Sequence, residues 1–256
     1  MSKWALVTGA TVGIGESFTR VLAHEGFSIV LVARDLERMK ERAASLESRY
    51  KVQTAIVQAD LATDAGCAKV EKYIIENQIE VLINNAGFGI NKAFSVSDLD
   101  SEQQLLDVLV RTPMRLMHTV LPQMKERNTG SIINVSSVAG WIAAGTYSAA
   151  KSYLTVLSES IHTEMSGTGV KISALCPGFT RTEFHERGRM RMNGLPEFMW
   201  LSADRVVNQA WKENQNGKVL SVPGWQYLIL STVSRFGPRP LVRKLGMNVR
   251  KRQRQK

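Results

Sequence analysis

The sequence predicts a single α/β domain built on a doubly wound parallel sheet with helices on both faces. Short β-branched runs alternate with longer helical segments along the chain, and this is the pattern of parallel strands joined by right-handed crossovers. The runs at 28–33 and 81–83 are almost wholly apolar, as strands covered on both faces should be. The length of 256 residues suits one domain with a full core.

The expected elements follow from this alternation. We expect seven strands, at 3–8, 27–33, 51–58, 80–84, 130–135, 170–175 and 218–221, and six helices between them, at 14–25, 35–49, 62–77, 99–126, 145–166 and 202–214. Gly26 falls where the first helix needs a left-handed cap, and Ser202 is placed to cap the sixth helix. Two stretches interrupt the pattern: 182–201 is rich in methionine and aromatic residues, and 225–245 mixes an apolar run with prolines and basic residues.

Composition narrows the class of protein. The two cysteines, Cys67 and Cys176, show no metal-ligand or disulfide spacing, which predicts a reducing compartment and no metal site. Because the first strand starts at about residue 3, no signal peptide is expected, and no apolar run is long enough to predict a spanning helix. The net charge is +10, but 235–256 hold nine basic residues and no acidic one. The rest of the chain is therefore near neutral.

A glycine-rich turn follows the first strand. Residues Thr8–Gly15 carry Gly9, Gly13 and Gly15 in the spacing Gly-x-x-x-Gly-x-Gly. Glycines let the backbone approach a pyrophosphate, and the next helix presents free N–H groups and a positive dipole end to it. A plain tight connection is the alternative. Asn84–Gly87 ends the fourth strand, at the sheet edge where ligands bind in such folds, and the two turns together favour a dinucleotide site.

The end of the second strand indicates which dinucleotide binds. Ala33 and Arg34 stand where an acidic residue would hold the adenosine ribose. A guanidinium suits a 2′-phosphate instead, which favours NADP(H) over NAD(H). The alternative is a surface ion pair of Arg34 with Asp35 or Glu37. Asp60, after the third strand, is a candidate to bind the adenine amino group or else to cap the following helix.

Residues suited to proton transfer follow the fifth strand. Ser137 lies at the strand end, and Tyr147 and Lys151 are four residues apart on the next helix, on one face of it. The ordinary pKa of tyrosine is about 10, and a nearby ammonium lowers that pKa. We expect Tyr147 to transfer a proton near neutral pH and Ser137 to hold the substrate oxygen by a hydrogen bond. For the tyrosine and lysine alone, an ordinary amphipathic helix is the alternative.

Taken in order, the segments Thr8–Gly15, Asn84–Gly87, Ser137–Lys151 and Pro177–Thr182 resemble the motifs of the short-chain dehydrogenase/reductase family, over about residues 3–222. The resemblance implies a Rossmann-type sheet and hydride transfer between a nicotinamide and a carbonyl or alcohol carbon. It implies that Lys151 also bonds the nicotinamide ribose and that Thr182 contacts the carboxamide. The expected catalytic residues are Ser137, Tyr147 and Lys151, and the expected cofactor-binding residues are Gly9, Thr11, Gly13, Ile14, Gly15, Arg34, Asp60, Asn85, Ala86, Gly87, Tyr147, Lys151, Pro177, Gly178, Thr180 and Thr182.

Two features depart from the family pattern. Leu109 stands where the family usually has an asparagine that supports a water-linked proton relay, and a leucine cannot hold a water. Tyr147 follows Ser137 by ten residues, where about thirteen is common, which predicts a short active-site loop and a pocket open on that side. The sequence therefore supports two hypotheses: an NADP(H)-dependent oxidoreductase, and a catalytically weakened, cofactor-sensing binding protein on the same scaffold.

The remaining stretches concern the substrate and partners. The segment 182–201 resembles the family's substrate lid, and its apolar content favours a small to medium apolar carbonyl or alcohol substrate; core packing or a partner interface is the alternative. We expect a catalytic domain at 1–224 and an apolar, then basic extension at 225–256.

The basic end of the chain predicts contact with a membrane surface or an acidic partner, or else a disordered, solubilising terminus. No aromatic residues are interleaved among the last dozen residues, so nucleic acid is not expected. A cytoplasmic location is expected, with peripheral contact at a membrane surface as the variant. The family resemblance also implies a homo-oligomer formed through the helices at 99–126 and 145–166.

Overall fold

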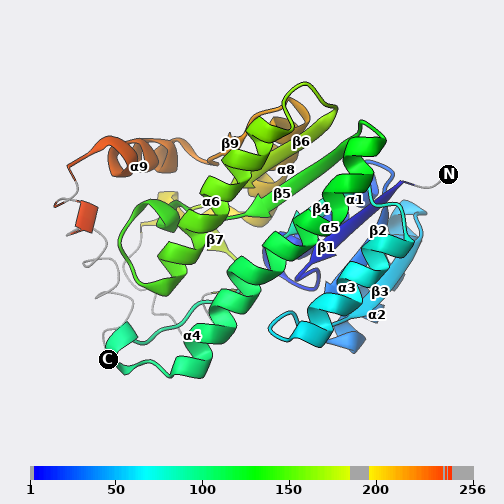
Figure 1. Cartoon of the computed structure of the whole chain (residues 1–256), viewed down its shortest axis with the longest axis horizontal. Helices are drawn as coiled ribbons and strands as arrows, with labels where there is room; N and C mark the ends of the chain where they lie inside the picture. Colours follow the sequence, from blue (N-terminus) through cyan, green and yellow to red (C-terminus); the bar gives the residue numbers. More distant parts are fainter. Residues whose placement is uncertain (1–2, 185–195, 239, 241, 244–256) are drawn as a thin grey trace.

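A computed structural model describes residues 3–184, 196–238, 240, 242 and 243. Seven strands form one parallel sheet in the order β3-β2-β1-β4-β5-β6-β9 (Figure 1). The predicted fold class is confirmed, and most strand boundaries lie within one to three residues of those expected. The strands are β1 (Trp4–Thr8), β2 (Ser28–Ala33), β3 (Thr54–Gln58), β4 (Val81–Asn84), β5 (Gly130–Val135), β6 (Val170–Leu175) and β9 (Leu220–Ser221).

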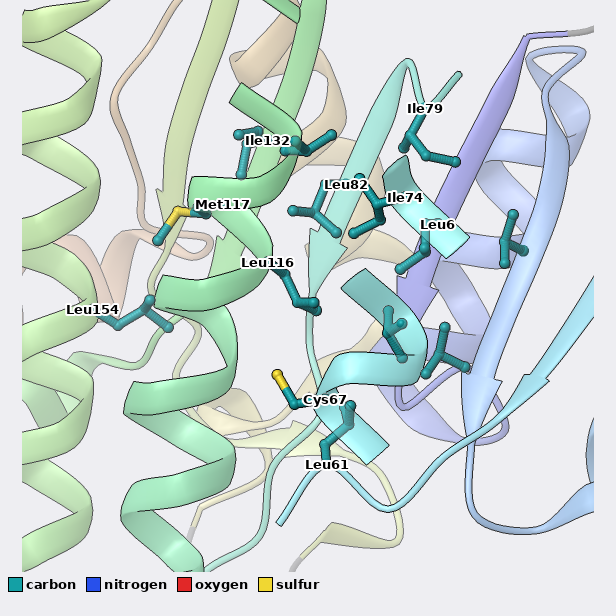
Figure 2. Close-up of a cluster of buried hydrophobic side chains, with 14 of the residues drawn as sticks. Leu6, Leu61, Cys67, Ile74, Ile79, Leu82, Leu116, Met117, Ile132 and Leu154 are labelled. Atoms are coloured by element: carbon teal, nitrogen blue, oxygen red, sulfur yellow. The ribbon is translucent and has the colours of Figure 1, made fainter. Parts of the chain in front are cut away.

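Helices cover both faces of the sheet, and a hydrophobic core lies under each layer. One layer contains α1 (Gly13–His24), α2 (Leu36–Tyr50), α8 (Ala203–Gln215) and α9 (Trp225–Phe236); the other contains α3 (Asp64–Glu76), α4 (Leu99–Leu106), α5 (Thr112–Glu126) and α6 (Thr146–Glu164). Figure 2 shows the second core, where Leu116 of α5 and Ile74 of α3 lie against Leu82 of β4. Because both faces are covered, the strands can be apolar throughout.

The strand order reverses between β1 and β4. From β1 the chain builds outward through β2 and β3, and from β4 it builds the other way through β5, β6 and β9. The loops after β1 and β4 therefore diverge at the carboxyl edge of the sheet, which is where open α/β sheets bind ligands.

The expected caps are confirmed. Gly26 adopts a φ of +86° after α1, which costs a glycine little. Ser202 caps α8 by accepting a hydrogen bond from the Arg205 N–H.

The helix expected at 99–126 is present over those residues, and it contains a π turn. A π turn, Asp107–Arg111, separates α4 from α5, and Pro113 stands in the first turn of α5, where a missing N–H costs nothing. Such π turns recur at functional sites, and this one contains Leu109. The hydrophobic periodicity of the sequence does not predict a π turn, because the apolar face of the helix continues across it.

A strand pair and a helix were also not expected. Strands β7 (Thr180–Arg181) and β8 (Leu201–Ser202) form a short parallel pair at the two ends of the expected lid. Helix α9 begins where the C-terminal extension was expected to begin, and its Tyr227 is fully buried in the core. Within the described part of the chain, no helix is both long and apolar enough to span a bilayer.

Candidate active site

The glycine-rich turn after β1 is held by side chains from β1 and from the loop after β4. The Thr8 hydroxyl donates to Ile83 O (3.2 Å) and accepts from the N–H groups of Asn85 (2.9 Å) and Ala86 (3.0 Å). The Asn85 amide donates to Thr8 O (2.9 Å) and to Gly9 O (3.1 Å). Asn85 was expected at the cofactor, and here its side chain fixes the shape of the turn. The part played by Thr8 was not expected.

The three glycines of the turn serve two purposes. Gly9 and Gly13 have φ values of +66° and +60°, which disfavour any residue with a Cβ. Gly15 is needed for space, because a Cβ there would lie 2.1 Å from Gly9 O. A Cβ on Gly13 would lie 2.9 Å from Cβ of Thr182, so the structure brings Thr182 beside the turn.

Two further residues of the turn, Thr11 and Ile14, have different surroundings. Thr11 is buried, and its carbonyl accepts a hydrogen bond from Arg42 Nε (3.4 Å). Ile14 packs on the core below α1 and α2. The N-terminal end of α1 is thereby fixed toward the carboxyl edge of the sheet.

Arg34 and Asp60 lie exposed after β2 and β3. The surface ion pair offered as the alternative for Arg34 does not form, because Asp35 pairs with Arg38 (3.6 Å) and Glu37 pairs with Lys40 (2.8 Å).

The helix-cap alternative for Asp60 is also wrong. Thr63 is the N-cap of α3, and the Asp60 carboxylate accepts a hydrogen bond from the Ala62 N–H (3.1 Å). Sequence spacing placed the cap three residues early because both residues are good caps.

The catalytic candidates come together after β5. Ser137 caps a short 3-10 turn, Val138–Trp141, by accepting from the Ala139 N–H (3.1 Å). Tyr147 lies in the first turn of α6, and Lys151 lies one turn further on. Lys151 is buried; its Nζ donates to Val135 O (2.6 Å) and lies 5.7 Å from the centre of the Tyr147 ring.

The neighbouring Ser136 has a structural role. Its hydroxyl donates to Lys151 O (2.8 Å) and lies 2.7 Å from the Thr155 hydroxyl. These bonds join β5 to α6 and hold the backbone that carries Lys151.

Burial sets the protonation of the tyrosine and the lysine. It raises the pKa of Tyr147 to about 12, while a hydrogen bond with Ser137 acts in the opposite direction. Burial lowers the pKa of Lys151 to about 8. The expected lowering of the Tyr147 pKa is therefore wrong for this structure, because loss of hydration outweighs the neighbouring groups. At neutral pH Tyr147 keeps its proton and can donate it.

The comparison with protein families shows the family to which the chain belongs. The family described as short chain dehydrogenase matches residues 3–192. The chain belongs to the short-chain dehydrogenase/reductase family. It is an NAD(P)-dependent oxidoreductase, in agreement with the names of its relatives.

Three relatives of this short-chain dehydrogenase/reductase illustrate the similarity. Very-long-chain 3-oxoacyl-CoA reductase-A of Danio rerio is 30% identical over 263 residues, which cover 99% of this chain and 80% of the relative. A short-chain dehydrogenase from Sphingobium yanoikuyae, solved in complex with NADPH, is 30% identical with a TM-score of 0.84, over 90% of this chain and 93% of that one. The bulky-bulky ketone specific alcohol dehydrogenase from Comamonas testosteroni is 30% identical with a TM-score of 0.79, over 90% and 92%.

The loop after β6 is held from below by α9. A Cβ on Gly178 would lie 2.0 Å from the Tyr227 ring, so the ring packs directly under Pro177-Gly178. The Tyr227 hydroxyl accepts from the Phe179 N–H (2.9 Å) and donates to Met199 O. The Thr180 hydroxyl donates to Gly178 O (3.1 Å). Sequence reasoning missed Tyr227, whose only signal was one polar aromatic residue in an apolar run.

Leu109 occupies the place where this family usually has its asparagine. A Cβ on Gly87 would lie 2.8 Å from Leu109 Cδ2 and 3.9 Å from Lys151 Nζ. The leucine side chain is thus beside Gly87, near the catalytic lysine, and it is buried.

The expected lid is described only at its ends, and 185–195 lie outside the described residues. At the first end, the Phe184 ring lies 5.9 Å from the Tyr147 ring, and Glu183 pairs with Arg38 of α2 (3.2 Å). At the second end, Trp200 packs on Phe179. The Phe184 ring therefore borders Tyr147, the candidate proton donor.

The pKa of Lys151 predicts the pH profile of carbonyl reduction. Between pH 6 and pH 7 both Tyr147 and Lys151 keep their protons, so kcat/KM should be level. Above about pH 8 Lys151 loses its charge, and kcat/KM should fall about tenfold per pH unit. Steady-state rates from pH 6 to 10 measure this. Lys151→Arg, whose guanidinium stays protonated, should lose the inflection; a wild-type profile level to pH 10 would contradict the assignment.

Proposed function

We propose that the enzyme reduces an apolar carbonyl compound with NADPH, with Tyr147 as the proton donor. The observation that carries the proposal is the convergence of Ser137, Tyr147 and Lys151, with Lys151 near Gly87 of the loop after β4 and Phe184 beside Tyr147. The raised pKa of Tyr147 suits a group that donates its proton at neutral pH.

In this mechanism each residue has one task. Bound NADPH supplies the hydride. Ser137 donates a hydrogen bond to the carbonyl oxygen of the substrate, and Tyr147 donates its proton to that oxygen as negative charge develops there. The Lys151 ammonium favours the resulting phenolate through its positive charge. Its own position is fixed by the hydrogen bond to Val135 O.

The preference for NADP(H) rests on Arg34. Its neighbours Asp35 and Glu37 are paired with Arg38 and Lys40, so neither carboxylate neutralises the guanidinium. No acidic residue stands at the tip of β2, where it would repel a 2′-phosphate.

Arg34→Ala should weaken NADPH binding and leave NADH binding unchanged. A hydrogen bond to a charged group contributes about 1.5–3 kcal/mol, so the Kd for NADPH should rise by about tenfold or more. Fluorescence titration with both nucleotides measures this. Lys72→Ala, which removes an exposed basic side chain of α3 that pairs with Glu76, is the matched control. An equal rise in the Kd for NADPH and for NADH would show that Arg34 does not bind the 2′-phosphate.

The proposed substrate is a carbonyl compound with a long or bulky apolar group. The apolar lid ends, Phe184 and Trp200, support this class. So do the relatives, two of which are named for very-long-chain 3-oxoacyl-CoA and for bulky-bulky ketones. The test is NADPH oxidation with a panel of 3-oxoacyl thioesters of increasing chain length, bulky aryl ketones and short polar ketones. Highest kcat/KM on the short polar ketones would overturn the proposed class.

Leu109 favours a second candidate, a cofactor-sensing protein with weak catalysis. The leucine is buried beside Gly87, where the family usually has the asparagine of the proton relay. Tight NADPH binding without turnover on any member of the panel would favour this candidate.

We further propose a homo-oligomer that packs through α5 and α6. Met114, Tyr153 and Val156 are large apolar residues exposed on these helices, and covering them would remove apolar surface from water. Sedimentation velocity on the full chain tests the proposal. The cytoplasmic location stays a prediction.

A further inference from the structure

One side of α9 carries a continuous apolar stripe that faces outward. Trp225, Leu228, Ile229, Val233 and Phe236 are exposed to 66%, 55%, 57%, 56% and 81%. Their spacing of mostly three or four residues places them on one face of the helix, and we call them the α9 stripe. Figure 1 shows α9 at one edge of the molecule.

The opposite side of α9 is fixed to the body of the protein, so the stripe cannot turn inward. Tyr227 is fully buried beneath the loop after β6, and Ser231 and Ser234 are buried with it. At the far end of the helix, Arg235 pairs with Glu159 of α6 (3.7 Å) and lies 5.5 Å from the centre of the Trp141 ring.

The part of the sequence that follows Glu213 carries charge of one sign. Glu213 is the last acidic residue of the chain, and ten basic residues follow it in the sequence. Arg235 is the charged residue of α9, and the other polar side chains of this helix are those of Gln226, Tyr227 and its serines and threonine, which are neutral. An apolar stripe that is followed in the sequence by basic residues complements a layer with an apolar interior and anionic groups on its surface.

We propose that the α9 stripe binds the surface of an anionic membrane, with the helix lying in the plane of the headgroups. Helices of this kind bury one apolar face at the boundary between headgroups and acyl chains, and anionic lipid attracts basic segments beside them. Trp225 suits that boundary because its ring is apolar and its N–H is polar.

A second copy of the chain fits the stripe less well. A helix of twelve residues is about 18 Å long, and one such stripe falls far short of the ~800 Å² per partner of a stable interface.

Membrane binding through this face would bring the substrate side of the enzyme close to the bilayer. The same helix contacts the turn that follows Ser137, through Trp141, and holds Met199 near the second end of the lid. An apolar substrate dissolved in the membrane would then reach the site by a short path. The binding itself does not depend on the proposed reaction.

The test is flotation of the full chain with vesicles of phosphatidylcholine alone and with about 30% phosphatidylserine. Wild-type protein should float with the anionic vesicles and partition about tenfold less onto the neutral ones. The double variant Leu228→Ser, Ile229→Ser should lose about tenfold or more of this partitioning. The matched control replaces two exposed apolar residues elsewhere, Ile75→Ser with Val96→Ser, and should float like the wild type.

Thermal unfolding and NADPH titration of both double variants check that the fold is intact. Vesicle binding by the stripe variant equal to that of the wild type would overturn the proposal, as would wild-type protein that stays in the soluble fraction. A stripe variant that changes only the sedimentation coefficient would also overturn it, and would assign the stripe to a second copy of the chain.

Discussion

Replacing Tyr147 with phenylalanine should lower kcat for carbonyl reduction by about a thousandfold and leave NADPH affinity within about twofold of the wild type. General acid catalysis by a positioned side chain contributes roughly 10²–10⁴-fold. Phenylalanine keeps the ring that packs near Phe184 and removes only the hydroxyl that bonds Ser137. The measurement is steady-state NADPH oxidation together with a fluorescence titration of NADPH.

Tyr153→Phe is the matched control for this experiment. Tyr153 lies on the same helix and is partly exposed, so its variant should keep the wild-type rate. If Tyr147→Phe retains more than about a tenth of wild-type activity, another group supplies the proton. Ser137 would then be the first residue to test, because it lies within hydrogen-bonding distance of Tyr147.

Gly15→Ala should raise the Kd for NADPH by about tenfold to a hundredfold and destabilise the fold by about 1–3 kcal/mol. The added methyl group would lie 2.1 Å from Gly9 O and 2.4 Å from Asn85 Nδ2. These atoms belong to the network that shapes the turn, so the turn must open to accept the methyl group. Chemical unfolding and NADPH titration measure the two effects.

Gly26→Ala separates steric conflict from backbone strain. Gly26 has a φ of +86°, and a Cβ there would meet nothing within 4 Å. Its substitution should therefore cost only about 1 kcal/mol of stability and leave the Kd for NADPH unchanged. An unchanged Kd in Gly15→Ala would show that the turn tolerates a wider shape than the structure indicates.

The sequence predicted the strands, the fold class and the glycine-rich turn because these depend on strong local signals. Apolar runs, glycine spacing and the order of the motifs are each visible in a short window of residues. Gly9, Gly13 and Gly15 have the conformational or steric constraint that their spacing suggested. Thr182 lies beside Gly13 of the glycine-rich turn, and Lys151 lies near the Tyr147 ring.

What could not be predicted depends on contacts between distant segments or on burial. Tyr227 packs against Gly178 although the two residues lie nearly fifty positions apart in the sequence. No local sequence pattern predicts such a contact. The pKa of Tyr147 moved opposite to the expectation because the loss of hydration exceeds the effect of its neighbours. The π turn at Leu109 was hidden because it does not interrupt the apolar pattern.

The packing of Tyr227 under Gly178 makes the residue types at these two positions depend on each other. The ring fills the volume that any side chain at position 178 would need, and its hydroxyl ties Phe179 to Met199. A chain cut after residue 224 would thus lose more than a terminal helix, since the loop after β6 and Met199, at the second end of the expected lid, would lose their shared anchor. The smallest fragment worth expressing as an enzyme extends through α9.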